Sequence, residues 1–240
     1  MAKFTGFFSF PFSQRKFQDE PFFLTRSPPD KQKNRRSNRV RILLVVDGQN
    51  DVFFLRRISG ILNRDDDTLP DLSVMELQGR LIFLPQGGIP DFVWCKNLAP
   101  LEIPEFHIYD KERSPETETR QRLVAEINRR SNCIARLTGK RMLENYLHSE
   151  VIVLCGGPEI AIGLDDDVPE RVAKEFWISS LKDIGWNELP QRAKKRCCNR
   201  AKRWLNSKVV EAMTPEFLKQ SDPDDEIRGW LTEIRVLSES

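Results

Sequence analysis

Four acidic residues stand at the ends of two apolar runs. Asp47 directly follows the run RVRILLVV, and Asp51 comes four residues later. Asp110 ends the run FHIYD, and Glu112 follows two residues on. Carboxylates that met in a dry cluster would repel one another, and a hard divalent cation such as Mg²⁺ would neutralise them. The alternative is that Asp47 and Asp51 are turn and N-cap residues and that Asp110 begins a loop.

The apolar runs predict the elements that would hold these acids. Residues 39–46 (RVRILLVV) end in five consecutive aliphatic residues, which is typical of a strand buried on both faces of a parallel sheet. Residues 51–63 carry apolar side chains at helical spacing, so the first unit is expected to be strand, turn and helix. Gly48 is expected to permit the sharp turn between them. In such sheets ligands bind outside the carboxyl ends of the strands, which is where the acids fall.

Strands and helices continue to alternate along the chain. We expect further strands at 72–77, 80–86, 106–110 and 133–137, and helices at about 90–99, 115–130 and 141–147. This alternation predicts an α/β fold of Rossmann-like type with a largely parallel sheet.

The chain is expected to have three parts. Residues 1–38 are basic and rich in proline, which favours a flexible arm, and residues 39–168 would form the α/β domain. Residues 169–240 read as a helical extension, ending in an amphipathic helix at 224–237. That last helix would pack back onto the domain or onto a partner chain, so the sequence leaves both a monomer and an oligomer possible.

The stretch LLVVDGQNDVFFLRRI resembles the first motif of the TOPRIM domain, in which a strand ends in an acid-Gly pair and a second acid opens the next helix. FHIYDKE resembles the second motif, an acidic pair after a later strand, and LIFLPQGG resembles the strand and Gly-rich turn between them. The stretch LTGKRMLENYLHSEVI is similar to the Glu-Asn-Tyr segment in TOPRIM domains of the OLD-family nucleases (overcoming lysogenisation defect). The resemblance covers about residues 39–155.

The resemblance implies a nuclease that hydrolyses phosphodiester bonds of DNA or RNA with one or two ions of Mg²⁺ or Mn²⁺. Asp47 matches the catalytic acid of the first motif, which is usually Glu, and Asp51 matches the helix-opening acid. Asp110 and Glu112 match the acidic pair, which is usually Asp-x-Asp, and Glu144 would be a further acid around the metal. The two departures keep the charge and change the reach of the side chain. The alternative is a weakened TOPRIM module that binds nucleic acid or regulates a partner.

Basic residues are candidates for contact with the nucleic acid. Residues 171–208 hold 11 Lys/Arg and 3 Asp/Glu, a net charge of +8, whereas residues 42–170 hold 14 and 22, a net charge of −8. Five basic residues recur at helical steps and would form a stripe for a phosphate backbone: Arg192, Lys195, Arg196, Arg200 and Arg203. The alternative is a solvated helix face. Lys140, Lys202 or Lys208 could neutralise charge in the transition state.

Several classes of protein are excluded by what the sequence lacks. There is no phosphate-binding motif of the G-x-x-x-x-G-K-[ST] type, so any ATPase partner would act in trans. The five cysteines show no C-x-x-C pairing, which argues against a zinc site or a disulfide framework and fits a cytoplasmic protein. No stretch approaches the roughly 18 apolar residues of a membrane span, so no membrane is expected among the partners.

Overall fold

The computed structural model describes residues 40–87, 98–180 and 184–239 of the 240-residue chain. The predicted basic arm at 1–38 lies outside the described residues, as does most of the helix expected near 90–99. The described residues belong to one compact unit.

Four strands form one parallel sheet in the order β2-β1-β3-β4. They are β1 (Ile42–Val46), β2 (Leu81–Pro85), β3 (Glu105–Tyr109) and β4 (Cys133–Leu137). Every residue of β1 and β3 is buried, as expected for strands in the middle of a parallel sheet. β1 is continuously aliphatic, whereas β3 also buries Glu105 and His107. The α/β fold with a parallel sheet and a helical C-terminal part is therefore confirmed.

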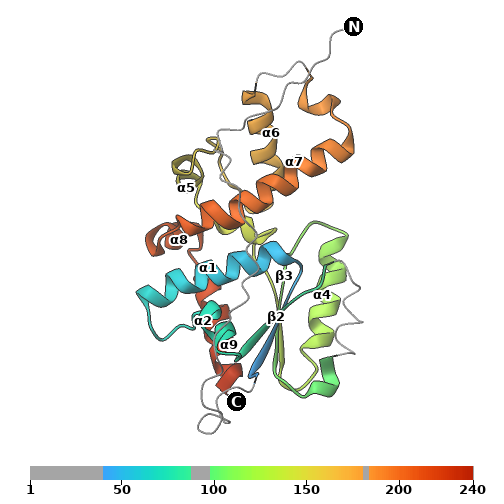
Figure 1. Ribbon diagram of the computed structural model, residues 1–240. Coiled ribbons are helices and arrows are strands. Elements are labelled where there is room, and N and C mark those ends of the chain that lie inside the picture. Colours follow the sequence, from blue (N-terminus) through green and yellow to red (C-terminus); the bar gives the residue numbers. More distant parts are fainter. Residues whose placement is uncertain (1–39, 88–97, 181–183, 240) are drawn as a thin grey trace, which may run out of the picture. The chain divides into compact units, whose positions relative to one another are not determined.

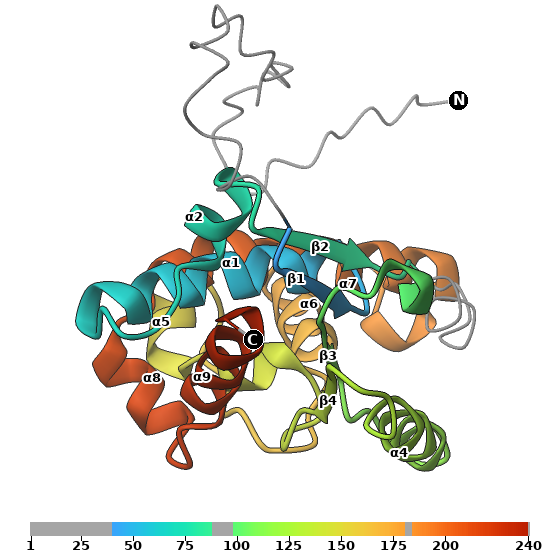
Figure 2. The same cartoon turned by 90° about the horizontal axis from the view of Figure 1, so that it is seen from below.

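Helices cover both faces of the sheet (Figures 1 and 2). On one face lie α1 (Gln49–Asp65), α2 (Leu72–Leu77) and α9 (Glu226–Glu239). On the other face α4 (Glu116–Ile127) packs against β3 and β4 through a small cluster of Tyr109, Ile127 and Ala135.

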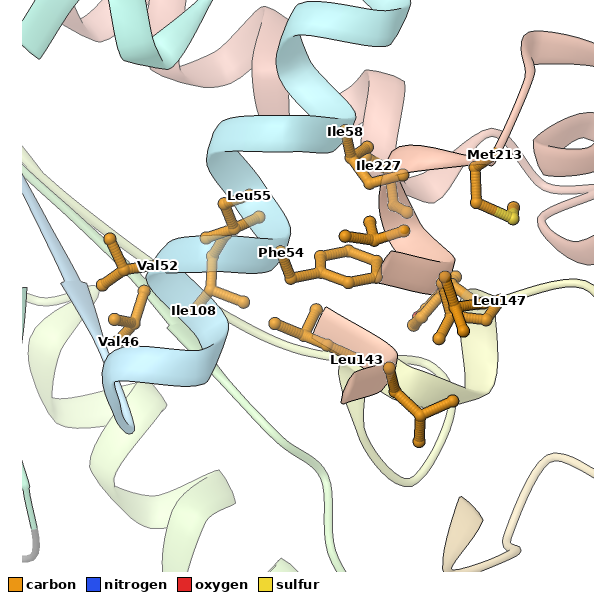
Figure 3. Close-up of a cluster of buried hydrophobic side chains, with 14 of the residues drawn as sticks. Val46, Val52, Phe54, Leu55, Ile58, Ile108, Leu143, Leu147, Met213 and Ile227 are labelled. Atoms are coloured by element: carbon orange, nitrogen blue, oxygen red, sulfur yellow. The ribbon is translucent and has the colours of Figure 1, made fainter. Parts of the chain in front are cut away.

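The main core lies on the α1 side of the sheet. Figure 3 shows side chains from β1, α1, β3 and α9 pointing toward one another, among them Val46, Phe54, Ile108 and Ile227. Phe54 is fully buried there, and Leu143 joins the cluster from the segment after β4. This apolar packing fixes the start of α1 over the carboxyl end of β1.

The later part of the chain is helical and contributes to the same core. Its elements are η2 (Leu143–Tyr146), α5 (Ser149–Leu154), α6 (Val168–Ser179), η3 (Trp186–Glu188), α7 (Gln191–Trp204), η4 (Leu205–Val209) and α8 (Pro215–Ser221). A short 3-10 helix, η1 (Ala99–Leu101), precedes β3. The segment η4 is a turn of π-helix that continues α7 without a break, and Trp204, Leu205 and Val209 are buried in the main core.

Two local expectations were wrong. Residues 72–77 were expected as a strand and form the helix α2, because Leu72 and Met75 pack one helical turn apart and Asp71 accepts hydrogen bonds from Ser73 N and Val74 N. Gly48 is not needed for the turn, since its backbone is extended at φ −160° and an added Cβ would meet only the Asp51 carboxylate at 3.9 Å.

Candidate functional site

Asp47 and Asp110 meet at the topological switch point of the sheet, between β1 and β3. β1 lies between β2 and β3, so the connection after β1 runs to one side and the connection after β3 to the other. In open α/β sheets this is the place where ligands bind. Asp47 follows β1 and Asp110 follows β3, and the backbone N–H of Asp110 donates to Asp47 Oδ2 at 3.1 Å.

Asp51 stands in the first turn of α1, above the end of β1. Its Oδ2 accepts a hydrogen bond of 2.7 Å from the backbone N–H of Gly48, which is half of a capping box. Its Oδ1 is buried and accepts no hydrogen bond. Asp51 is thus the N3 residue of α1 rather than its N-cap, which is Gly48, and its capping hydrogen bond uses only one of the two carboxylate oxygens.

Glu144 reaches the same place from η2. The backbone N–H of Leu143 donates to Asp110 Oδ1 at 3.0 Å, so this segment is tied to the end of β3. Glu144 is fully buried, and its Oε2 accepts no hydrogen bond. The structure thus brings Asp51, Asp110 and Glu144 together from three separate segments.

The three carboxylates surround the ammonium group of Lys202, which comes from the last turn of α7. Lys202 Nζ lies 3.8 Å from Asp51 Oδ1, 3.8 Å from Asp110 Oδ2 and 3.5 Å from Glu144 Oε1. Of the three lysines considered from the sequence, Lys202 is the one in contact with these acids. Its side chain is 27% exposed, whereas the carboxylates are almost completely covered.

The electrostatics of the cluster reflect burial and crowding. Burial raises the pKa of Asp51 to about 7 against the opposing effect of Lys202, and the charges of Glu144 and Asp47 raise it further. Burial, followed by the charge of Asp51, raises the pKa of Asp110 well above its ordinary value. Burial alone would lower the pKa of Lys202, but the neighbouring carboxylates raise it above its usual range. The single ammonium group of Lys202 therefore does not balance the charge of the three carboxylates around it.

Asn206 is a fifth member of the cluster, which sequence reasoning missed. It lies in the π-helical turn, is fully buried, and donates from Nδ2 to Glu144 Oε1 and to the backbone oxygen of Lys202. Its Oδ1 has no hydrogen-bond partner. Its signal in the sequence is the position four residues after Lys202, a spacing that places two side chains on the same face of a helix.

A divalent cation fits the chemistry of this oxygen set. Asp51 Oδ1, Glu144 Oε2 and Asn206 Oδ1 are buried oxygens without a hydrogen-bond partner, and such groups are costly unless something neutralises or satisfies them. Carboxylate and amide oxygens are the ligands that Mg²⁺ and Mn²⁺ prefer. Across the described residues, no three His, Cys, Asp or Glu side chains stand as a ready-made metal site, since here the carboxylates are arranged around an ammonium group.

Asp47 is held beside the cluster by Arg120, a second residue that sequence reasoning missed. Arg120 Nη1 lies 2.5 Å from Asp47 Oδ2 and donates to the backbone oxygen of Asp110 at 2.8 Å. Arg120 comes from α4, ten residues after Asp110, and no local pattern distinguishes it from the other basic residues of that helix. It clamps the ends of β1 and β3 together and neutralises Asp47.

The structure does not bring Glu112 and Lys140 into the cluster. Glu112 has a left-handed backbone with φ 55°, and its Oε2 lies 3.4 Å from Arg141 Nε. Lys140 Nζ donates to the backbone oxygens of Asn145 and Ser221 and sits 4.8 Å from the centre of the Tyr146 ring. Burial lowers the pKa of Lys140.

The basic stripe lies on α7, the helix that carries Lys202. All five residues expected in it are exposed: Arg192, Lys195, Arg196, Arg200 and Arg203. The distance from the first to the last is roughly 16 Å at the rise of an α-helix. Lys208, the third candidate lysine, donates instead to the backbone oxygen of Cys155 at 3.0 Å.

No protein-family model matches the sequence, and no curated protein matches it. A similar solved structure is the C-terminal region of the OLD protein of Xanthomonas campestris pv. campestris, with 13% identity, 82% of this chain and 98% of that chain covered, and a TM-score of 0.41. That TM-score does not establish a common fold, so we draw no conclusion on family or activity from it. No helix in the described part of the chain combines the length and apolar character needed to cross a bilayer.

Proposed function

We propose that this protein is a metal-dependent nuclease of TOPRIM type that hydrolyses phosphodiester bonds in DNA or RNA. The observation that carries the proposal is the convergence of Asp51, Asp110 and Glu144 at the carboxyl edge of the sheet, with buried oxygens that lack hydrogen-bond partners. A dry carboxylate cluster of this kind destabilises the protein, so its presence is best explained by a cation that it holds.

These three acids would hold Mg²⁺ or Mn²⁺, and Asn206 would contribute a neutral oxygen. The bound ion would supply activation of water and stabilisation of charge on the attacking and leaving oxygens. Asp47 stands next to the cluster, where it would orient a water molecule or act as a further ligand of the ion. Its side chain is one methylene shorter than the Glu that is usual at this position of the first TOPRIM motif.

The protein's own cations would bind the substrate. Lys195 and Lys202 are seven residues apart, close to two helical turns, so they lie on the same side of α7 about 10 Å from each other. A phosphate backbone that follows the exposed stripe would therefore pass the acidic cluster. Contacts of this kind carry no sequence information, which favours a nuclease with little sequence preference.

The direct test is cleavage of a mixed panel of labelled DNA and RNA substrates with Mg²⁺ or Mn²⁺. We expect nicking or degradation that stops with a chelator and is lost in Asp110→Asn, which keeps an oxygen for the Leu143 N–H and removes the charge. Asp67→Asn changes an exposed acid and should cleave as the wild type does. Cleavage by Asp110→Asn at the wild-type rate would contradict the proposed site.

A second candidate is a catalytically weakened module that binds nucleic acid or regulates a partner, with any ATPase acting in trans. The observation in its favour is the ion pair of Asp47 with Arg120, which occupies the acid expected to take part in the chemistry. Asp47→Glu separates the two candidates, because a large gain of cleavage indicates a weakened site. An unchanged rate in an already active protein supports the nuclease.

A further inference from the structure

Lys202 occupies the position where the three carboxylates could converge on a cation. Its Nζ is at nearly the same distance, 3.5 to 3.8 Å, from one oxygen of each of Asp51, Asp110 and Glu144. Direct charge-assisted hydrogen bonds are about 2.7–2.9 Å long, so the ammonium group satisfies none of the three closely. It stands at the centre of the oxygen set rather than paired with one partner.

An ammonium group at this centre and a divalent ion cannot occupy it together. Mg²⁺ binds oxygen at about 2.0–2.1 Å, well inside the present distances from Nζ to the carboxylates. Ion binding therefore requires that the ammonium leave and that the carboxylates close in. Among the described residues no three acidic, histidine or cysteine side chains stand as a ready-made metal site, and these three acids are arranged around an ammonium group instead.

The side chain of Lys202 is less covered than those of the three acids. Its side chain is 27% exposed, whereas those of Asp51, Asp110 and Glu144 are 5%, 6% and 0% exposed. A change of rotamer along its four-carbon stem would move the charge toward solvent without movement of α7. There it would join the exposed stripe, where Lys195 and Arg203 lie on the same helix.

We propose that Lys202 is a built-in competitor for the cation site: it neutralises Asp51, Asp110 and Glu144 in the metal-free protein and is displaced onto the nucleic-acid surface when a divalent cation binds. The inference rests on the proposed metal-dependent function and adds a coupling to it. Metal binding and release of the lysine are then linked, so the ion strengthens the positive surface for phosphate as well as filling the site.

The first test is calorimetric titration of Mn²⁺ into the wild-type protein, Lys202→Met and the control Lys219→Met, which removes an exposed charge on α8. If the ammonium occupies the site in about nine molecules of ten, its removal should tighten apparent Mn²⁺ binding about tenfold. Lys219→Met should bind as the wild type does. Equal or weaker binding by folded Lys202→Met overturns the inference while leaving the metal site in place. No Mn²⁺ binding in any of the three proteins overturns the proposed function itself.

The second test uses the wild-type protein, so it does not depend on the folding of a variant. Trace acetylation of lysine amines is measured by mass spectrometry with a chelator and with saturating Mn²⁺. Labelling of Lys202 should rise several-fold with Mn²⁺, while exposed Lys219 and Lys140, which is held by two carbonyls, should keep their rates. A Lys202 rate that stays constant or falls when Mn²⁺ binds overturns the inference.

Discussion

Replacing Asp51 by Asn should make the metal-free protein more stable, although Asp51 is almost completely buried. Its Oδ2 accepts from the Gly48 N–H at 2.7 Å, and an amide oxygen can keep that hydrogen bond. Its other oxygen has no hydrogen bond to lose. The substitution therefore removes only a buried negative charge. Burial raises the pKa of the Asp51 carboxyl from 3.8 to about 7. The charge of Lys202 opposes this rise, and the charges of Glu144 and Asp47 add to it.

The size of the effect follows from the difference between the pKa values of the folded and unfolded states. Below pH 3.8 the carboxyl is protonated in both states and its ionisation costs no stability. As the pH rises, the unfolded state loses its proton first, so stability falls until the folded carboxyl also ionises near pH 7. The full cost above that pH is about 4 kcal/mol, and at pH 5 it is about 2 kcal/mol. Asn carries no charge, so the variant should exceed the wild type by these amounts.

The measurement is urea denaturation followed by circular dichroism, with a chelator, at pH 5 and pH 8. The exposed control Asp67→Asn should stay within about 0.5 kcal/mol of the wild type at both values. The reasoning is refuted if Asp51→Asn is less stable than the wild type at pH 8. It is also refuted if the gain is the same at the two pH values, because a gain from packing would not follow the titration.

Two further predictions concern the cation and the nucleic acid. Mn²⁺ at a hundred times its Kd should raise the unfolding free energy of the wild type by about 2.7 kcal/mol, and a thermal-shift assay should show that Asp110→Asn loses this gain. Replacing Lys195 and Arg196 together by Gln should lower the slope of log affinity against log salt by roughly 0.7–0.9 for each lost phosphate contact, measured by anisotropy of a labelled oligonucleotide. The matched pair Arg122 and Arg129, exposed on and just after α4, should leave that slope unchanged when replaced by Gln.

The sheet and the first helix were predictable because local patterns specify them. A run of aliphatic residues as continuous as residues 42–46 is typical of a strand buried on both faces in the middle of a parallel sheet, and β1 lies there. The carboxyl ends of parallel strands share one edge, so the meeting of Asp47 and Asp110 also followed from the sequence.

Short apolar runs were less informative. LSVMEL contains six residues, which is too few for periodicity to separate a strand from a helix. The helix α2 is specified by Asp71, whose carboxylate caps its first turn, and by the packing of Leu72 and Met75 onto α1 and its neighbours. The cap was visible in the sequence, but the packing was not.

Spacing along the chain also could not decide which charged side chains face the acidic cluster. Glu112 is two residues from Asp110, yet its left-handed backbone turns it to Arg141. Lys140 is four residues from Glu144, yet the backbone oxygens of Asn145 and Ser221 hold its ammonium group over the Tyr146 ring. Both side chains are directed by tertiary partners that no sequence motif contains.

Residues of the helical C-terminal part complete the acidic cluster, although they lie far along the chain from β1 and β3. Lys202 and Asn206 come from α7 and η4, more than 90 residues after Asp110, and both contact Glu144. Without them the carboxylate of Glu144 would lose its hydrogen bond from Asn206 and its nearest positive charge, and a buried anion left without partners strongly destabilises a protein. The α/β part and the helices that follow it must therefore fold together for the acidic site to exist. From the sequence, Lys202 was one of three candidate lysines beside a basic surface, whereas its contact with Glu144 makes the helical part a component of the acidic cluster.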